Sequence, residues 1–159
     1  MLNIANIFCA LFLFTASFFD KKTRKIPNIL NIIGVIIGFA INYNNLFNTF
    51  IGFLYGFVLG YILFLMGTMG AGDGKMFAAV GAIAGIDVLF KSLIISLIIF
   101  LVYILLENRK NFKDFFEYEK NALLSLFAKV KPVDNGKRSA FAPFLFIGFI
   151  IYQILQVWR

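Results

Sequence analysis

The sequence contains no histidine and only one cysteine, Cys9, among its 159 residues. The lack of histidine excludes Ser-His and Cys-His nucleophile systems, and it also excludes zinc sites built from His and Cys ligands at the usual spacing. A single cysteine cannot form a disulfide within the chain, and Cys9 is interpreted as a packing residue in an apolar run. The eight Asp and Glu residues are therefore the main candidates for catalytic side chains. We expect no metal and no cofactor.

Charged residues are also scarce. They make up 14% of the chain, whereas 61% of the residues are hydrophobic and the mean hydropathy is +0.88. This composition predicts an integral membrane protein with a single domain, residues 1–159. The net charge of +7 does not indicate nucleic-acid binding, because the basic residues cluster beside apolar segments, as they do at the cytoplasmic ends of membrane helices. We predict contacts with membrane lipid and none with nucleic acid.

Six apolar segments predict the fold class: an all-α, polytopic membrane bundle of six transmembrane helices. The fourth segment is short, and its periodicity alone does not show that it spans the membrane. Glycines recur every four residues in several segments, which predicts close helix packing in a compact bundle. The six predicted segments are residues 2–19, 28–41, 50–66, 76–86, 88–106 and 139–158.

The distribution of basic residues predicts the orientation. With the N-terminus outside, the loops that carry Asp20 and Asp73 and the long loop 107–138 all fall inside. Of the fifteen basic residues, only Lys91 and Arg159 then lie outside, which leaves thirteen inside. Apolar residues at helical spacing in loop 107–138 predict a cytoplasmic amphipathic helix on the membrane surface, followed by a turn before the last segment.

Two acids stand out by their position. Asp73 lies in the run Gly70-Ala71-Gly72-Asp73-Gly74-Lys75, between two apolar segments, and Asp20 ends the first apolar segment just before a basic cluster. A carboxylate at the edge of a bilayer is costly to bury and is a functional candidate by default. Glycines allow the backbone to leave helical geometry and approach another group closely. The pattern predicts a site with two carboxylates on the cytoplasmic side.

Three stretches together resemble a known family. They are Asp20 to Asn28 (DKKTRKIPN), Gly70 to Gly81 (GAGDGKMFAAVG) and Ala140 to Leu145 (AFAPFL). In this order and on six segments, they resemble the GxGD intramembrane aspartyl proteases, and most closely the bacterial prepilin peptidases, or type IV leader peptidases. The resemblance covers the chain from Asp20 to about Gly148. The archaeal preflagellin peptidases share the two acids, but the stretch around Pro143 favours the bacterial group.

The resemblance implies that Asp20 and Asp73 are the catalytic pair of an aspartic endopeptidase. It implies a multi-pass protein of the inner membrane that cleaves a short basic leader from prepilin or pseudopilin substrates at the cytoplasmic face. The larger members carry a paired-cysteine region linked to N-methylation, and this chain has only Cys9. It therefore resembles the short, peptidase-only members. We interpret a second group of residues as supporting the site: Gly70, Gly72, Gly74, Lys75, Pro27 and Asn28.

The chemistry follows from the residues themselves, because two carboxyls that share one proton can activate a water and protonate the cleaved amide. Helix ends favour an ionised Asp73 before a helix start and a protonated Asp20 at a helix end, although Lys21 and Lys22 beside Asp20 oppose this assignment. The same acids also have structural interpretations. Asp73 could cap a helix, Asp20 could be a snorkelling interface residue, and Lys75 could be an interface anchor.

Two other functions fit parts of the pattern. A small transporter or proton pathway would use the two acids as a relay, but they lie at segment edges and no other acid continues a path through the bilayer. A Ser-Lys protease would use Lys75 as base and Ser17 or Ser92 as nucleophile. Ser92 is expected near the outer face, far from Lys75, which argues against this pairing.

Overall fold

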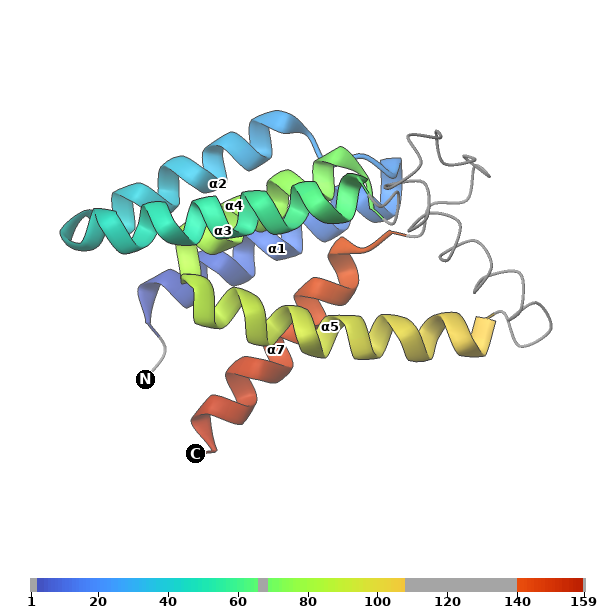
Figure 1. Cartoon of the computed structure of the whole chain (residues 1–159). Coiled ribbons are helices and arrows are strands. Elements are labelled where there is room, and N and C mark those ends of the chain that lie inside the picture. Colours follow the sequence, from blue (N-terminus) through green and yellow to red (C-terminus); the bar gives the residue numbers. More distant parts are fainter. Residues whose placement is uncertain (1–2, 66–68, 108–139, 159) are drawn as a thin grey trace.

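The computed structural model describes residues 3–65, 69–107 and 140–158, and all regular structure in these residues is helical. The predicted all-α class is therefore confirmed. The predicted amphipathic helix and the turn that follows it lie outside the described residues. The elements, shown in Figure 1, are α1 (Ile4–Thr23), α2 (Asn28–Ile41), the short 3₁₀ helix η1 (Tyr43–Asn45), α3 (Leu46–Leu65), α4 (Ala71–Ala84), α5 (Ile86–Glu107) and α7 (Ala142–Val157).

Two helix boundaries differ from the sequence prediction in a way that affects both acids. Helix α1 continues to Thr23 and ends where Arg24 takes a left-handed conformation (φ 54°), so Asp20 lies in its last turns. Helix α4 begins at Ala71 instead of Met76, so Asp73 is helical. Glycine lowers helix propensity, which is why the run around Asp73 reads as a break in the sequence. Packing against neighbouring helices overrides that preference here.

Helix α4 lies at the centre of the bundle. It packs most extensively against α3 and α2 and also contacts α1 and α5. Nine of its fourteen residues are buried, including Phe77 and Val80, which are fully enclosed. Helix α7 packs against α5 and α1 on the other side (Figure 1). The central helix therefore begins at one end of the bundle with Asp73 in its first turn.

Glycines allow α3 and α4 to approach closely. Gly52, Gly56 and Gly60 are the buried glycines of α3, spaced four residues apart on one face. A Cβ added to Gly56 would lie 2.2 Å from the carbonyl oxygen of Phe77, and one added to Gly60 would lie 2.4 Å from the Cα of Gly74. No side chain fits at these contacts, so the predicted close packing of glycine-bearing helices is observed.

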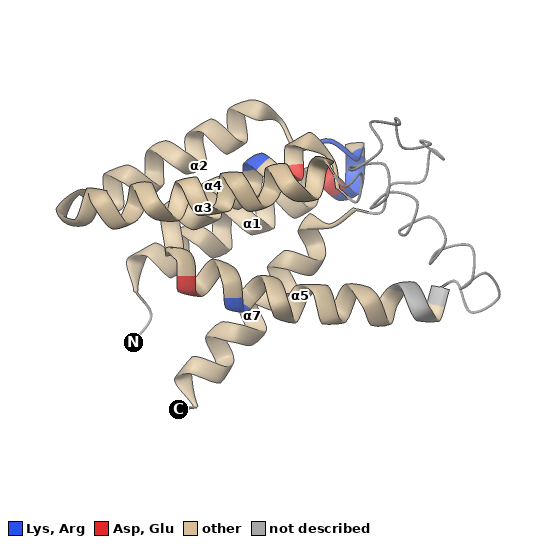
Figure 2. Ribbon diagram, viewed as in Figure 1, with Lys and Arg blue, Asp and Glu red and all other residues tan. Residues whose placement is uncertain are grey.

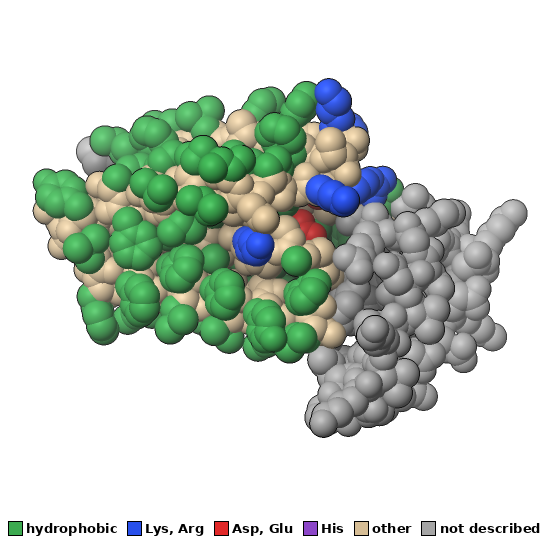
Figure 3. Space-filling model, turned by 90° about the horizontal axis from the view of Figure 1, so that it is seen from above, with side chains coloured by type: hydrophobic (Ala, Val, Ile, Leu, Met, Phe, Trp, Pro, Cys, Tyr) green, Lys and Arg blue, Asp and Glu red, His purple; other side chains and the backbone are tan. Residues whose placement is uncertain are grey.

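Within the described residues, three helices are long and apolar enough to cross a membrane by length and composition, namely Ile4–Thr23, the α3 region Tyr43–Leu65, and Ile86–Tyr103. Helices α2 and α7 are apolar but shorter, with 14 and 16 residues. At about 1.5 Å per residue, a helix of this length is shorter than the roughly 30 Å hydrocarbon core. The count of six crossings stays a prediction. Many large apolar side chains are exposed on the described part of the surface in Figure 3, as expected of a membrane protein.

Candidate active site

Both predicted acids lie at the same end of the bundle. Asp20 is in the last turns of α1, and Asp73 is in the first turn of α4, which contacts α1. Figure 2 shows the acidic and basic positions of α1 and α4 gathered at this end, near the start of α2. In Figure 3, acidic atoms lie between basic side chains at this end. The two carboxylates thus come from separate helices and share one face of the protein.

Asp73 forms hydrogen bonds with Gly70, the residue that precedes α4, through both its side chain and its backbone. Its carboxylate Oδ2 accepts a hydrogen bond of 3.0 Å from the backbone N–H of Gly70, and its own backbone N–H donates to the Gly70 carbonyl at 3.1 Å. A negative charge is favoured here by the helix N-terminus. Capping and catalysis are therefore compatible, because one carboxylate oxygen binds the backbone and the group remains half-buried.

Asp20 is held by a helix that lies far away in the sequence. Its carboxylate Oδ2 accepts a hydrogen bond of 3.0 Å from the backbone N–H of Ala142, the first residue of α7. The backbone of Phe141 interacts with the same carboxylate. Asp20 is only 5% exposed. A buried carboxylate without partners is very costly, so these backbone donors make the position possible.

The two acids share one kind of hydrogen-bond partner, although Asp20 is buried and Asp73 is half-buried. Each carboxylate accepts a backbone N–H at the N-terminus of a helix, α4 for Asp73 and α7 for Asp20. The sequence places Asp20 at the unfavourable end of its own helix, but the start of α7 supplies a positive terminus that the sequence alone does not reveal. The start of α7 therefore offsets the unfavourable end of α1 at Asp20, and which of the two acids carries the proton stays a prediction.

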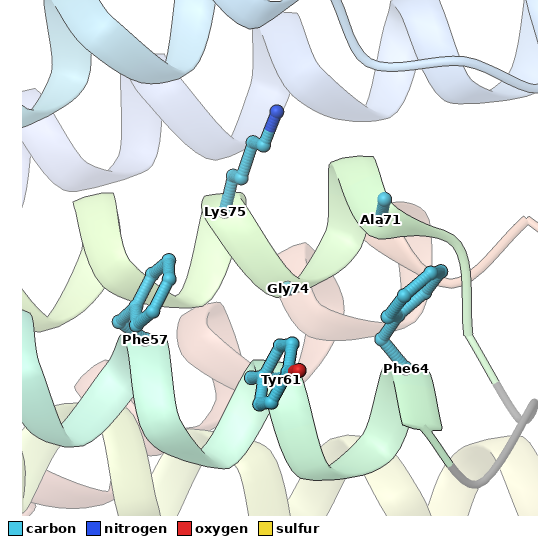
Figure 4. A pocket seen from close by; sticks show the side chains of 7 residues that line it. Phe57, Tyr61, Phe64, Ala71, Gly74 and Lys75 are labelled. Atoms are coloured by element: carbon cyan, nitrogen blue, oxygen red, sulfur yellow. The ribbon is translucent and has the colours of Figure 1, made fainter.

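The predicted supporting residues connect α2 to α4. Pro27 precedes the first residue of α2, Asn28, as predicted. The Asn28 side-chain oxygen accepts a hydrogen bond of 2.8 Å from Lys75 Nζ. Lys75 therefore links two helices, and Figure 4 shows its side chain pointing away from the aromatic residues of α3. Pro27 and Asn28 set the start of α2 beside the first turns of α4.

The glycines of the Asp73 turn have different packing roles. Their backbones do not need a left-handed conformation, since Gly85 is the glycine with positive φ among the described residues. Gly74 is buried against Gly60 of α3, where a Cβ would lie 2.9 Å from the Gly60 carbonyl oxygen. At Gly72 a Cβ would meet Ile26 at 3.4 Å, which is an ordinary contact. Close helix approach is therefore the reason for glycine at Gly74.

Sequence reasoning missed two contributors to the site. Asn31 of α2 is 3% exposed, and its side-chain amide donates to the Gly72 carbonyl at 3.2 Å. The second contributor is the backbone N–H of Ala142. Asn31 could have been noticed as a polar residue inside an apolar segment, three residues after Asn28. No sequence signal identifies a backbone N–H as the partner of an acid 122 positions away.

A groove of about 250 Å³ runs beside the site without including either acid. Aromatic side chains of α3 form one wall, and Ala71, Gly74 and Lys75 of α4 form the other (Figure 4). Asp73 belongs to a different face of the same helical turn. The aromatic residues of this wall are Phe57, Tyr61 and Phe64.

The contacts do not support a Ser-Lys pair. The Ser17 hydroxyl donates to the Leu13 carbonyl, and the Ser92 hydroxyl donates to carbonyls of its own helix, α5. The Lys75 amine donates to Asn28. A relay of acids through the bilayer also lacks support among the described residues, because Asp87 starts α5 at the opposite end of α4 from the other two acids.

The fold and these contacts define a class: a helical membrane protein with two carboxylates on separate helices at one end of the bundle. The comparison with protein families agrees with this class, since the type IV leader peptidase family matches residues 7–105. The chain belongs to this family and is therefore, at the level of the family, a protease of the leader peptidase type. No curated protein and no solved structure matches the chain.

Proposed function

We propose that the protein is a membrane-embedded aspartic endopeptidase that removes the short basic leader from prepilin-like or pseudopilin proteins at the cytoplasmic face of the inner membrane. One observation carries this proposal. Asp20 and Asp73 lie on different helices at one end of the bundle, and each uses one carboxylate oxygen to accept a backbone N–H. Family membership supports peptide hydrolysis as the reaction.

The proposed chemistry needs only the two acids and a water. The ionised carboxylate takes a proton from the water, which attacks the peptide carbonyl carbon. The protonated carboxyl donates a hydrogen bond to the carbonyl oxygen and later gives its proton to the leaving nitrogen. In the proposed active state, the two acids together carry one proton.

A direct cleavage assay tests the proposed function. The purified protein in detergent is incubated with a prepilin that carries its leader, and the product is identified by mass. We expect a single cut between the leader and the hydrophobic helix. A prepilin with a disrupted cleavage junction is the control and is expected to stay intact. If the prepilin with the intact cleavage junction also stays uncut by a well-folded enzyme, the proposed substrate class is wrong.

The proposed topology has six crossings with both termini outside, and cysteine labelling in intact cells tests it. On a Cys9→Ser background, we expect an impermeant thiol reagent to label a cysteine at Asn45 and not one at Lys22. Both side chains are exposed, Asn45 in η1 and Lys22 in the last turn of α1. The basic cluster around Lys22 favours the inside. Labelling of Lys22→Cys from outside would reverse the orientation and move the site away from the cytoplasm.

We also propose that the enzyme does not methylate its product. In the larger members of the family that the sequence resembles, N-methylation is linked to a paired-cysteine region. This chain has only one cysteine, Cys9. With S-adenosylmethionine present, the trimmed prepilin is expected to keep a free amino terminus. Mass spectrometry of the product decides the question, because a methyl group on the terminus adds about 14 Da. A methylated product would assign methyltransferase activity to this short chain.

A further inference from the structure

Two asparagine side-chain amides, one near each end of helix α2, donate to backbone carbonyls of the central helix. Near the start of α2, the Asn31 amide donates to the carbonyl of Gly72 at 3.2 Å. Just after the end of α2, the Asn42 amide donates to the carbonyls of Ala82 and Ile83 at 3.1 and 3.0 Å. The two amides therefore bind carbonyls at opposite ends of α4, and of the two, Asn31 binds the end that carries the proposed catalytic Asp73. The Asn28 oxygen also reaches this end of α4, but it does so through the Lys75 side chain and not through the backbone.

Packing alone does not explain Asn31. The side chain is 3% exposed in a helix that is otherwise rich in Ile, and its Oδ1 atom is buried with no hydrogen-bond partner in the described part of the chain. A buried amide oxygen without a hydrogen-bond partner destabilises the folded protein, because it loses its contacts with water and gains none in return. An apolar side chain would avoid this cost, so the contact with Gly72 is the feature that distinguishes Asn31 from its neighbours.

The contact acts on the residue next to Asp73. Gly72 has no side chain that another helix could contact, so a hydrogen bond from another helix must use its backbone carbonyl. Asn31 binds this carbonyl, and Ile26 lies against the Gly72 backbone, where an added Cβ would be 3.4 Å away. Together the two residues fix the first turn of α4 against α2, while the far side of that turn lies against Gly60 of α3.

We propose that Asn31 is a positioning residue that sets the place of Asp73 relative to Asp20 through its hydrogen bond to the Gly72 carbonyl. This inference rests on the proposed function, in which the two acids share a proton and a water. Such a pair depends on its spacing, because a displacement of about 1 Å at a catalytic group can lower a rate on the order of 100-fold. Substrate binding does not depend on the same spacing.

Asn31→Leu and Asn42→Leu form a matched pair of variants, since each removes one side-chain amide bound to α4 and adds a similar apolar side chain. We expect Asn31→Leu to lower kcat for prepilin cleavage about 10- to 100-fold with KM within about twofold. Asn42→Leu is expected to keep kcat within about twofold, because it acts at the distant end of α4. Thermal unfolding of both variants shows whether they are equally folded.

A second measurement does not depend on activity. Spin labels are attached at Lys22→Cys and Ala71→Cys on a Cys9→Ser background, since both side chains are exposed and lie within two residues of Asp20 and Asp73. We expect the distribution of label distances to broaden or shift with Asn31→Leu and to stay unchanged with Asn42→Leu. An unchanged distribution with Asn31→Leu overturns the positioning role. So does an equal loss of kcat in both variants. If the wild-type protein does not cleave prepilin, the proposed function fails and the label distances alone decide the role of Asn31.

Discussion

Asp20→Asn and Asp73→Asn are each expected to lower cleavage of a prepilin about 10²- to 10⁴-fold, to the limit of detection in most assays. Asparagine keeps the size of the side chain and its acceptor oxygen, so the contacts with Ala142 and Gly70 can persist. It cannot share or transfer the proton that the reaction needs. Initial rates with purified enzyme measure the effect, and thermal unfolding shows that both variants remain folded.

Asp87→Asn is the matched control for the two acids. Asp87 is exposed in the first turn of α5, at the end of α4 opposite Asp73. Its replacement is expected to leave the rate within about twofold, as for a surface substitution far from the site. Near-normal cleavage by either Asp20→Asn or Asp73→Asn would show that the two-acid mechanism is wrong. A large loss with Asp87→Asn would show that the assay responds to any lost charge.

The second large effect is expected for Gly56→Ala in α3. The added methyl group would lie 2.2 Å from the Phe77 carbonyl oxygen and 2.6 Å from its carbonyl carbon, and these are backbone atoms that cannot rotate away. Helices α3 and α4 must separate to make room. Overpacking of this kind typically costs about 1–3 kcal/mol. We expect a lower unfolding temperature in detergent and, because α4 carries Asp73, a loss of cleavage as well.

Gly72→Ala provides the matched control because it adds the same methyl group to a neighbouring helix. Its Cβ would meet Ile26 at 3.4 Å, an ordinary van der Waals distance. We expect its unfolding temperature to stay close to that of the wild type. If Gly56→Ala proved as stable as Gly72→Ala, the close contact of α3 with α4 would not be needed for stability.

The sequence was informative where the signal is local. The apolar run after Pro27 predicted α2 with the bounds that the structure has, because proline and the periodicity act within a few residues. The start of α4 was not predictable in this way. Its glycines disfavour a helix locally, and the first turn is helical where Gly72 lies against Ile26 and Gly74 packs against Gly60 of α3.

The two acids could be predicted from the sequence, whereas their hydrogen-bond partners could not. Asp20 and Asp73 are visible in the sequence because a carboxylate is unusual at the edge of an apolar segment. Their hydrogen-bond partners are backbone groups of Gly70 and Ala142, which carry no distinguishing side chain. The partner of Asp73 is three positions away, whereas that of Asp20 is 122 positions away and depends on the way the helices pack. Long-range backbone contacts of this type require a structure.

The hydrogen bond between Asp20 and Ala142 has a consequence for biosynthesis. Asp20 is translated 122 positions before Ala142, so the donor that stabilises its buried carboxylate is made only when the start of α7 has been synthesised. A chain that has inserted α1 to α5 already contains both acids, yet Asp20 still lacks this partner. The geometry of the pair is therefore completed by the last helix, and hydrolytic competence is expected to arise after insertion of α7 instead of growing with each helix.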